Sequence, residues 1–144
     1  MIDKVFIHRH IYLDGGNGKL LTEGFNFKDH LKIEIVPFII THPDFGQIIA
    51  VEVSITTILT NDFYKYHTRT EFIIKGSPDF SNNHDKQLLA EMCVIAYHHT
   101  GQYFAQSRAM VAWNKEKLEQ ISVETVLSEI ASGKIPLPAA GQFV

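Results

Sequence analysis

The feature of this sequence that most constrains its fold is a change in the spacing of apolar residues partway along the chain. Up to about residue 75, apolar and polar residues alternate, which is the two-residue period of a β-strand. From about residue 85, apolar residues recur every three or four positions, which is the period of an α-helix. Strands therefore precede helices, and the pattern predicts an α+β fold rather than one of alternating strands and helices.

Four antiparallel strands are predicted in the first part, at about residues 4–13, 31–40, 49–56 and 64–74. The glycine-rich stretch at 14–18 ends the first strand, and His42-Pro43-Asp44 is typical of a turn. Asn61-Asp62 tolerates the left-handed backbone of a tight hairpin, so the third and fourth strands are predicted to form one.

A long helix is predicted to begin near Asp85, with Gly101 in its interior as a possible kink or close contact. A shorter helix follows, for which Ser122 is the predicted N-cap and Gly133 the residue after the C-terminus. Residues 135–138 leave it as an extended tail. We expect residues 1–144 to form a single domain with one sheet and one helical layer.

Charge and cysteine content restrict the partners and the compartment. The net charge of −3 and the scattered lysines and arginines argue against a nucleic-acid partner. The single cysteine and the absence of a leader pattern predict a soluble cytoplasmic protein, and no apolar stretch is long enough for membrane insertion.

The run Gly15–Lys19 lacks both the first glycine and the final Ser or Thr of a phosphate-binding loop. No cofactor is predicted.

Histidine and cysteine side chains are the candidate reactive groups of this sequence. His8 and His10 lie two apart on a strand, so both could face one metal ion, with His67 as a third ligand. The favoured interpretation is that these are unpaired surface histidines, and no metal site is predicted. On the long helix, His98 and His99 are predicted to be solvated, in preference to acid–base chemistry with Glu91 or Asp85. Cys93 is predicted to be a small core residue.

The distribution of apolar residues between the two sheet faces is more informative. Phe6, Tyr12 and Phe38 are predicted to lie opposite the face that holds Ile7, Ile33 and Val51. Helices cover one face of such a sheet, and the other should be polar unless something covers it. Large exposed apolar patches mark interaction surfaces, so we expect this surplus to bind sister copies or other chains. The alternative is that the long helix covers more of the sheet.

The order of these elements resembles the SecB-like family, the export chaperone SecB and its relatives. The family's fold is a four-stranded antiparallel sheet followed by two helices. The resemblance covers nearly the whole chain. Residues 4–12 resemble the family's first strand, residues 25–29 with 31–35 its crossover segment and the next strand, and residues 51–56 with 68–72 its long hairpin. Residues 90–97 with 103–108 resemble its main helix, and residues 135–138 its proline-containing exit.

The resemblance implies a tetrameric protein that captures unfolded segments in apolar grooves without ATP. It implies that Leu20, Leu21, Phe25 and Phe27 bind polypeptide, because they match the crossover segment. The chain departs from family members that pass clients to the export motor SecA, which carry a Cys/His zinc tail and strong acidity. Residues 115–132 also add length before the exit. A role in protein transport stays open. A client unrelated to export, as in a toxin–antitoxin chaperone or an accessory protein, stays open as well.

We therefore predict a non-enzymatic, ATP-independent chaperone-like protein that forms a homo-oligomer, a dimer or a tetramer, and holds unfolded or partner polypeptides. Two alternatives remain. One is a structural subunit of a larger assembly. The other is a hydrolase that uses His98 or His99, although thioesterases of the hot-dog fold place their central helix between the first strands, and here the helix follows all four.

Overall fold

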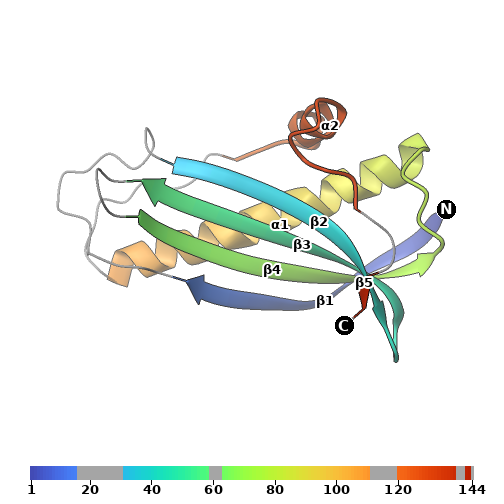
Figure 1. The fold of residues 1–144 in the computed structure, drawn as a ribbon, viewed down its shortest axis with the longest axis horizontal. Helices are drawn as coiled ribbons and strands as arrows, with labels where there is room; N and C mark the ends of the chain where they lie inside the picture. Colours follow the sequence, from blue (N-terminus) through green and yellow to red (C-terminus); the bar gives the residue numbers. More distant parts are fainter. Residues whose placement is uncertain (16–30, 59–62, 111–119, 139–141, 144) are drawn as a thin grey trace.

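The structure is a computed structural model that describes residues 1–15, 31–58, 63–110, 120–138 and 142–143. Four long strands precede two helices, and a two-residue strand follows near the C-terminus (Figure 1). The elements are β1 (Ile2–Gly15), β2 (Leu31–His42), β3 (Gly46–Ile58), β4 (Phe63–Gly76), α1 (Asn83–Met110), α2 (Val123–Ala131) and β5 (Gln142–Phe143). The α+β fold, with four antiparallel strands before a long and a shorter helix, is confirmed.

The strands form one sheet in the order β1-β4-β3-β2-β5. Neighbours among the four long strands are antiparallel, and Ile58 of β3 pairs with Phe63 of β4, as the predicted hairpin requires. β5 pairs in parallel with β2 through Ile40 and Thr41, an element that the sequence did not predict. β1 and β2 are consecutive in the chain but are separated in the sheet by β4 and β3. β1 is thereby an edge strand.

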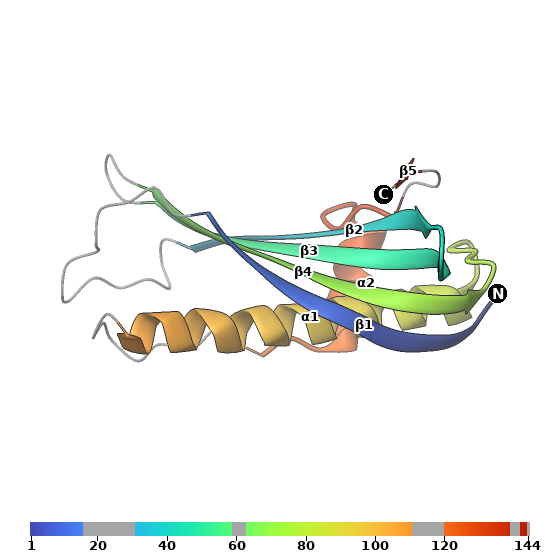
Figure 2. The same cartoon turned by 90° about the horizontal axis from the view of Figure 1, so that it is seen from below.

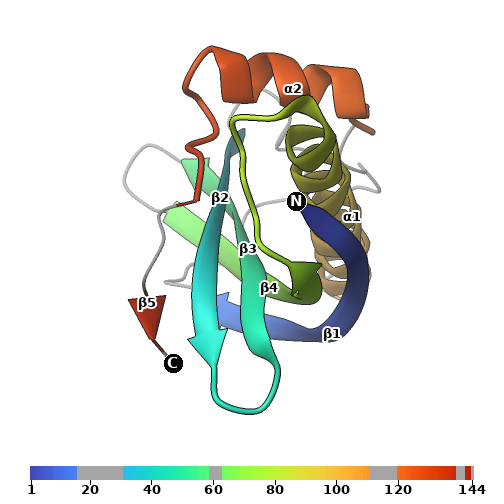
Figure 3. The same ribbon diagram turned by 90° about the vertical axis from the view of Figure 1, so that its right-hand side faces the viewer.

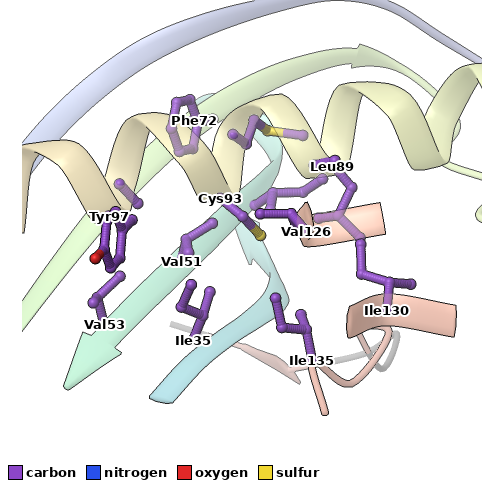
Figure 4. Close-up of a cluster of buried hydrophobic side chains, with 14 of the residues drawn as sticks. Ile35, Val51, Val53, Phe72, Leu89, Cys93, Tyr97, Val126, Ile130 and Ile135 are labelled. Atoms are coloured by element: carbon purple, nitrogen blue, oxygen red, sulfur yellow. The ribbon is translucent and has the colours of Figure 1, made fainter. Parts of the chain in front are cut away.

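Both helices lie on the same face of the sheet, with α1 along its length (Figure 2). Alternate residues of the central strands point toward α1, because successive side chains on a strand face opposite ways. On β3 these are Val51 and Val53, and on β4 they include Phe72, and all three are fully buried. Figure 4 shows them beneath Leu89, Cys93 and Tyr97 of α1, while Val126 and Ile130 of α2 and Ile135 close the side of the cluster near β2.

The ends of the helices follow the predicted capping residues closely. The Ser122 hydroxyl accepts a hydrogen bond from the Thr125 N–H at 3.2 Å, which confirms this N-cap. Gly133 follows α2 with φ +84°, and its N–H donates to the Ile130 carbonyl. α1 begins two residues before Asp85, whose N–H donates to the side chain of Asn82. Neither helix, over the residues described, combines the length and the apolar character needed to cross a membrane.

The far face of the sheet, opposite the helices, carries a second and smaller apolar cluster. Ile40, Ile48 and Ala50 are buried there, with Phe38 and Ile73 packed against them. The β2–β3 turn reaches across the sheet toward β1, because the ring of Phe45 lies 4.7 Å from that of His8. Figure 3 shows this hairpin from its turn. Part of the apolar surplus on the far face, including Phe38, is therefore packed within one copy. That the remainder binds other copies or other chains stays a prediction.

Candidate polypeptide-binding surface

The edge strand β1 carries two large apolar side chains that the fold leaves at least half exposed. Phe6 is 50% exposed and Ile7 is 54% exposed, and as successive residues they point to opposite faces of the sheet. Phe6 pairs with Ile73 and lies on the far face, whereas Ile7 pairs with Phe72 and lies on the helix face. As predicted, Phe6 and Phe38 lie on the opposite face of the sheet from Ile7, Ile33 and Val51. The side chain of Tyr12 lies outside the described part of the chain.

A groove runs between β1 and α1 on the helix face. Its volume is about 260 Å³, and Phe72 of β4 lies between the two walls. One wall belongs to the edge strand and the other to successive turns of the helix, so an extended segment laid along β1 would contact both. The lining residues are apolar except for one carboxylate: Val5, Ile7, Phe72, Leu88, Glu91, Met92 and Ile95.

The structure does not describe where the residues that the family resemblance assigned to polypeptide binding lie relative to the groove. Leu20, Leu21, Phe25 and Phe27 lie outside the described residues. They belong to the connection between β1 and β2, and those two strands occupy opposite sides of the four-stranded antiparallel part of the sheet. Their role stays a prediction.

The predicted pairing of His8 with His10 on one face of β1 is wrong. Ile7 pairs with Phe72 and Arg9 with Glu71, so β1 has one extra residue between them, a β-bulge at His8. The bulge reverses the alternation beyond it. The ring of His8 therefore contacts Phe45 near the far face, whereas the ring of His10 lies 4.6 Å from His99 of α1. His67, the third suggested ligand, instead pairs with Glu52 at 3.2 Å.

The prediction that His98 and His99 are solvated is also wrong. Both side chains are partly buried, and one ring nitrogen of each, His98 Nε2 and His99 Nδ1, is buried without a hydrogen bond. Burial, and then the charge of His98, lower the pKa of His99. An acid–base pair with Asp85 is excluded, because 14 residues of helix span about 21 Å. The Asp85 carboxylate instead accepts hydrogen bonds from the backbone of Ile2 and Asp79.

Cys93 lies where the sequence predicted, in the core beneath α1. Its side chain is fully buried among apolar neighbours, including Met92 and Ala96. Burial raises the pKa of the thiol to about 12, so the group stays protonated and unreactive at neutral pH. The prediction of a small core residue is confirmed.

An ionic cluster on the far face was missed by the sequence reasoning. Arg9 binds the carboxylate of Glu71 through two nitrogens, at 2.7 and 3.3 Å, and Glu71 is only 3% exposed. These hydrogen bonds raise the pKa of Arg9. Arg69 approaches the same carboxylate at 3.6 Å, beyond hydrogen-bonding distance, and stacks over Phe38. The shared parity of Arg69 and Glu71 was visible in the sequence, but the bulge that aligns Arg9 with them was not.

Comparison with known proteins gives a distant likeness to solved structures. No family model matches the chain, and no curated protein matches it. Among solved structures, a SecB-like chaperone of Mycobacterium tuberculosis, in complex with a ChAD peptide from the HigA1 antitoxin, superposes with a TM-score of 0.44. The two sequences are 15% identical, and the match covers 85% of this chain and 87% of the other. The likeness is one of fold and assigns no activity to this chain.

Proposed function

We propose that this chain is an ATP-independent, chaperone-like protein of the SecB type that self-associates and holds non-native or partner polypeptides. The observation that carries the proposal is the edge strand β1, on which Phe6 and Ile7 are each at least half exposed and Ile7 lines an apolar groove. Proteins usually protect an exposed strand edge, because its free backbone groups and apolar side chains recruit other chains. The bulge at His8 interrupts this edge, so the segment before it, where Phe6 and Ile7 are exposed, is the part suited to binding another polypeptide.

The chemistry of such a site is tolerant of sequence. An extended segment that adds to a strand edge binds through its backbone, which every polypeptide shares. Burial of apolar side chains contributes about 25 cal/mol per Å² without demanding a particular residue. Backbone pairing suits a contact between copies of the chain, apolar burial suits the holding of many non-native chains, and neither needs nucleotide hydrolysis or a bound cofactor.

Within this proposal, backbone pairing at β1 joins copies of the chain, and the groove binds clients together with Leu20, Leu21, Phe25 and Phe27. The groove lies on the helix face, so pairing of two β1 edges in the plane of the sheet leaves the α1 wall available. The four residues of the β1–β2 connection are included because all are apolar and match the family's crossover segment.

Self-association is expected to depend on the apolar character of β1. The variant Phe6→Lys introduces a charge on the far face of that edge. Pairing of the β1 edges of two copies would bury one such charge from each copy, which costs several kcal/mol. We expect dissociation to the monomer in light scattering. Val36→Lys is the matched control, because Val36 lies on the same face of β2 with 39% exposure. A wild-type protein that is monomeric at every concentration would contradict this part of the proposal.

Client holding is expected to depend on the groove and on the β1–β2 connection. The triple variant Ile7→Ser/Phe25→Ser/Phe27→Ser should need several-fold more protein to suppress aggregation of a thermally unfolding client, measured by turbidity without ATP. Leu137→Ser removes a similarly exposed apolar side chain, at 47% exposure, outside the groove and is expected to behave like the wild type. If the wild type leaves aggregation unchanged and a pull-down finds one stoichiometric partner, the chain is an accessory subunit instead.

A further inference from the structure

The far face of the sheet carries three successive rows of paired side chains from β1 and β4. The first row is cationic, the second is apolar and the third is an ion pair. The rows are Lys4 with Lys75, Phe6 with Ile73, and Arg9 with Glu71. Because alternate residues of a strand share a face, neighbouring rows are about 6.6 Å apart.

The β-bulge at His8 brings Arg9 into this surface. Under strict alternation, Arg9 and Phe6 have opposite parity, and Arg9 would point to the helix face. The extra residue in β1 turns Arg9 to the far face instead, which is a known effect of bulges on the side chains beyond them. Four residues thereby form one surface, the basic patch: Lys4, Phe6, Arg9 and Lys75.

The basic patch is exposed, and its positive charge exceeds what its neighbours neutralise. Lys4 and Lys75 are both exposed, and the side chain of Arg9 is 54% exposed. Among the described residues, the one carboxylate in ion-pair contact with the patch is that of Glu71, which is buried and also lies near Arg69. The whole chain has a formal charge of −3, so this excess of cations is local.

The pairing of Lys4 with Lys75 does not help the fold. Like charges directly opposite each other on neighbouring strands are destabilising. Within the described part of the chain, neither ammonium group has an ion-pair partner, and this includes the adjacent carboxylate of Asp3. Lysines often protect a strand edge from unwanted pairing, which accounts for Lys4 on β1 but not for Lys75 on the internal strand β4. An anion bound between the two would remove the repulsion.

We propose that the basic patch binds an acidic segment of a partner polypeptide, extended along β1 on the far face, with an apolar side chain between two carboxylates. In an extended segment, side chains two residues apart share a face and are separated by about 6.6 Å, which is also the spacing of the rows. The first carboxylate lies between Lys4 and Lys75, the apolar side chain against Phe6, and the second carboxylate at Arg9.

Arg9 retains donors for the second carboxylate. A guanidinium group has five N–H donors, and Arg9 binds Glu71 through Nε and Nη2. Its Nη1 makes no hydrogen bond within the described residues. Hydrogen bonds between a guanidinium and a carboxylate are among the stronger ones, because both groups are charged.

The apolar row favours a polypeptide over a single-stranded nucleic acid. Nucleic-acid platforms stack successive bases on several aromatic side chains. The patch offers one exposed aromatic ring, that of Phe6 at 50% exposure, and its neighbour in the row is the aliphatic Ile73. An aliphatic or aromatic side chain of a peptide fits this row, whereas a run of bases does not.

The basic patch is separate from the candidate groove. The groove lies on the helix face, and backbone pairing of two β1 edges lies in the plane of the sheet, so both leave the far face accessible. Both helices also lie on the other face (Figure 2). Binding at the patch therefore goes beyond the proposed holding of clients, and either can fail without the other.

Fluorescence anisotropy of the full chain with a labelled peptide, Ser-Glu-Ser-Leu-Ser-Glu-Ser, tests the proposal at low ionic strength. We expect the same peptide with both glutamates replaced by glutamine to bind at least several-fold more weakly. The double variant Lys4→Gln/Lys75→Gln should lose most of this preference. Lys32→Gln/Lys134→Gln removes two exposed lysines outside the patch and should bind both peptides like the wild type.

Two further measurements separate binding from folding and from client holding. The urea midpoint of Lys4→Gln/Lys75→Gln should equal or exceed that of the wild type, because the change removes a repulsion, and its suppression of client aggregation should be unaltered. A lower midpoint would show that the lysines support the fold and would contradict the argument. Should the double variant fold poorly, Lys75→Gln alone is expected to reduce the preference for the acidic peptide.

Three binding results would overturn the proposal. The first is equal binding of the glutamate and glutamine peptides by the wild type, which includes no detectable binding of either. The second is the wild-type preference in the Lys4→Gln/Lys75→Gln variant. The third is tighter binding of a short oligothymidylate than of the acidic peptide, which would assign the patch to nucleic acid.

Discussion

Replacing Asp85 with alanine is expected to lower the free energy of unfolding by about 3–5 kcal/mol, because it leaves buried groups without their partner. The Asp85 side chain is fully buried. Its carboxylate accepts hydrogen bonds from the N–H groups of Ile2 at 3.0 Å and Asp79 at 2.8 Å, and it lies 2.9 Å from His84 Nδ1. One side chain thus fixes the start of β1, the loop after β4 and the first turn of α1.

The measurement is urea denaturation at equal protein concentration, since self-association would otherwise shift the midpoint. Asp85→Asn keeps the shape but exchanges one acceptor oxygen for a donor, so its loss should be intermediate. Asp44→Ala removes an exposed carboxylate from the β2–β3 turn and should change the stability by less than about 0.5 kcal/mol. A loss at Asp85 no larger than that at Asp44 would contradict the proposed anchoring role.

Acid should weaken the wild type through the same group. Burial alone would raise the pKa of Asp85, but the hydrogen bonds from Asp79, His84 and Ile2 outweigh it and hold the pKa below its usual value. A carboxyl with a lowered folded pKa stabilises the protein fully above its unfolded pKa of about 3.9 and loses that contribution as the pH falls through the folded pKa. Asp85→Ala should lack this acid-dependent loss.

Local sequence signals predicted the elements of this fold well. The alternating residues of β3 and β4, the hairpin between them and the Ser122 cap of α2 all depend on residues close in the chain. Each of these signals acts over a few residues, and burial of one face then reinforces it. The helix α1 was predicted for the same reason, since its apolar spacing persists over many turns.

Features that depend on contacts between distant segments were not predicted. The bulge at His8 reversed the parity of β1 beyond it, so His10 turned toward α1 and Arg9 toward Glu71. Strict alternation gives no sign of an extra residue, because a bulge is defined by its partner strand. β5 is equally invisible in the sequence, since two residues carry no period and their pairing with β2 arises from the folded chain.

The same contrast between local features, which were predicted, and long-range features, which were not, is found at the candidate site. The sequence predicted that Phe6 and Ile7 would lie on opposite faces of the first strand, which is confirmed, but not that this strand is an edge strand on which both are exposed. It did not predict the groove, in which residues of β1 meet residues of β4 and α1 that lie more than sixty positions further along the chain. Nor did it predict that Ile40 and Ile48 would be buried on the far face within one copy.

Phe72→Ala is expected to destabilise the protein by about 3–5 kcal/mol, as large-to-small changes of a fully buried aromatic residue do. Phe72 pairs with Ile7 on one side and Ile49 on the other, and it lines the groove beneath Met92. Truncation removes its packing in the core and also deepens the groove, so the core and the candidate site are weakened by one change. Thermal and urea denaturation at equal protein concentration measure the loss.

Two variants separate the contribution of Phe72 from general damage to the sheet. Ile73→Ala alters the next residue, which points to the far face and is only partly buried, so it should cost less than half as much. Phe72→Leu retains most of the apolar volume and should cost about 1–2 kcal/mol. If Phe72→Ala were no more costly than Ile73→Ala, α1 could not be packed tightly on β4, and the groove between α1 and β1 would have no floor on which a client could rest.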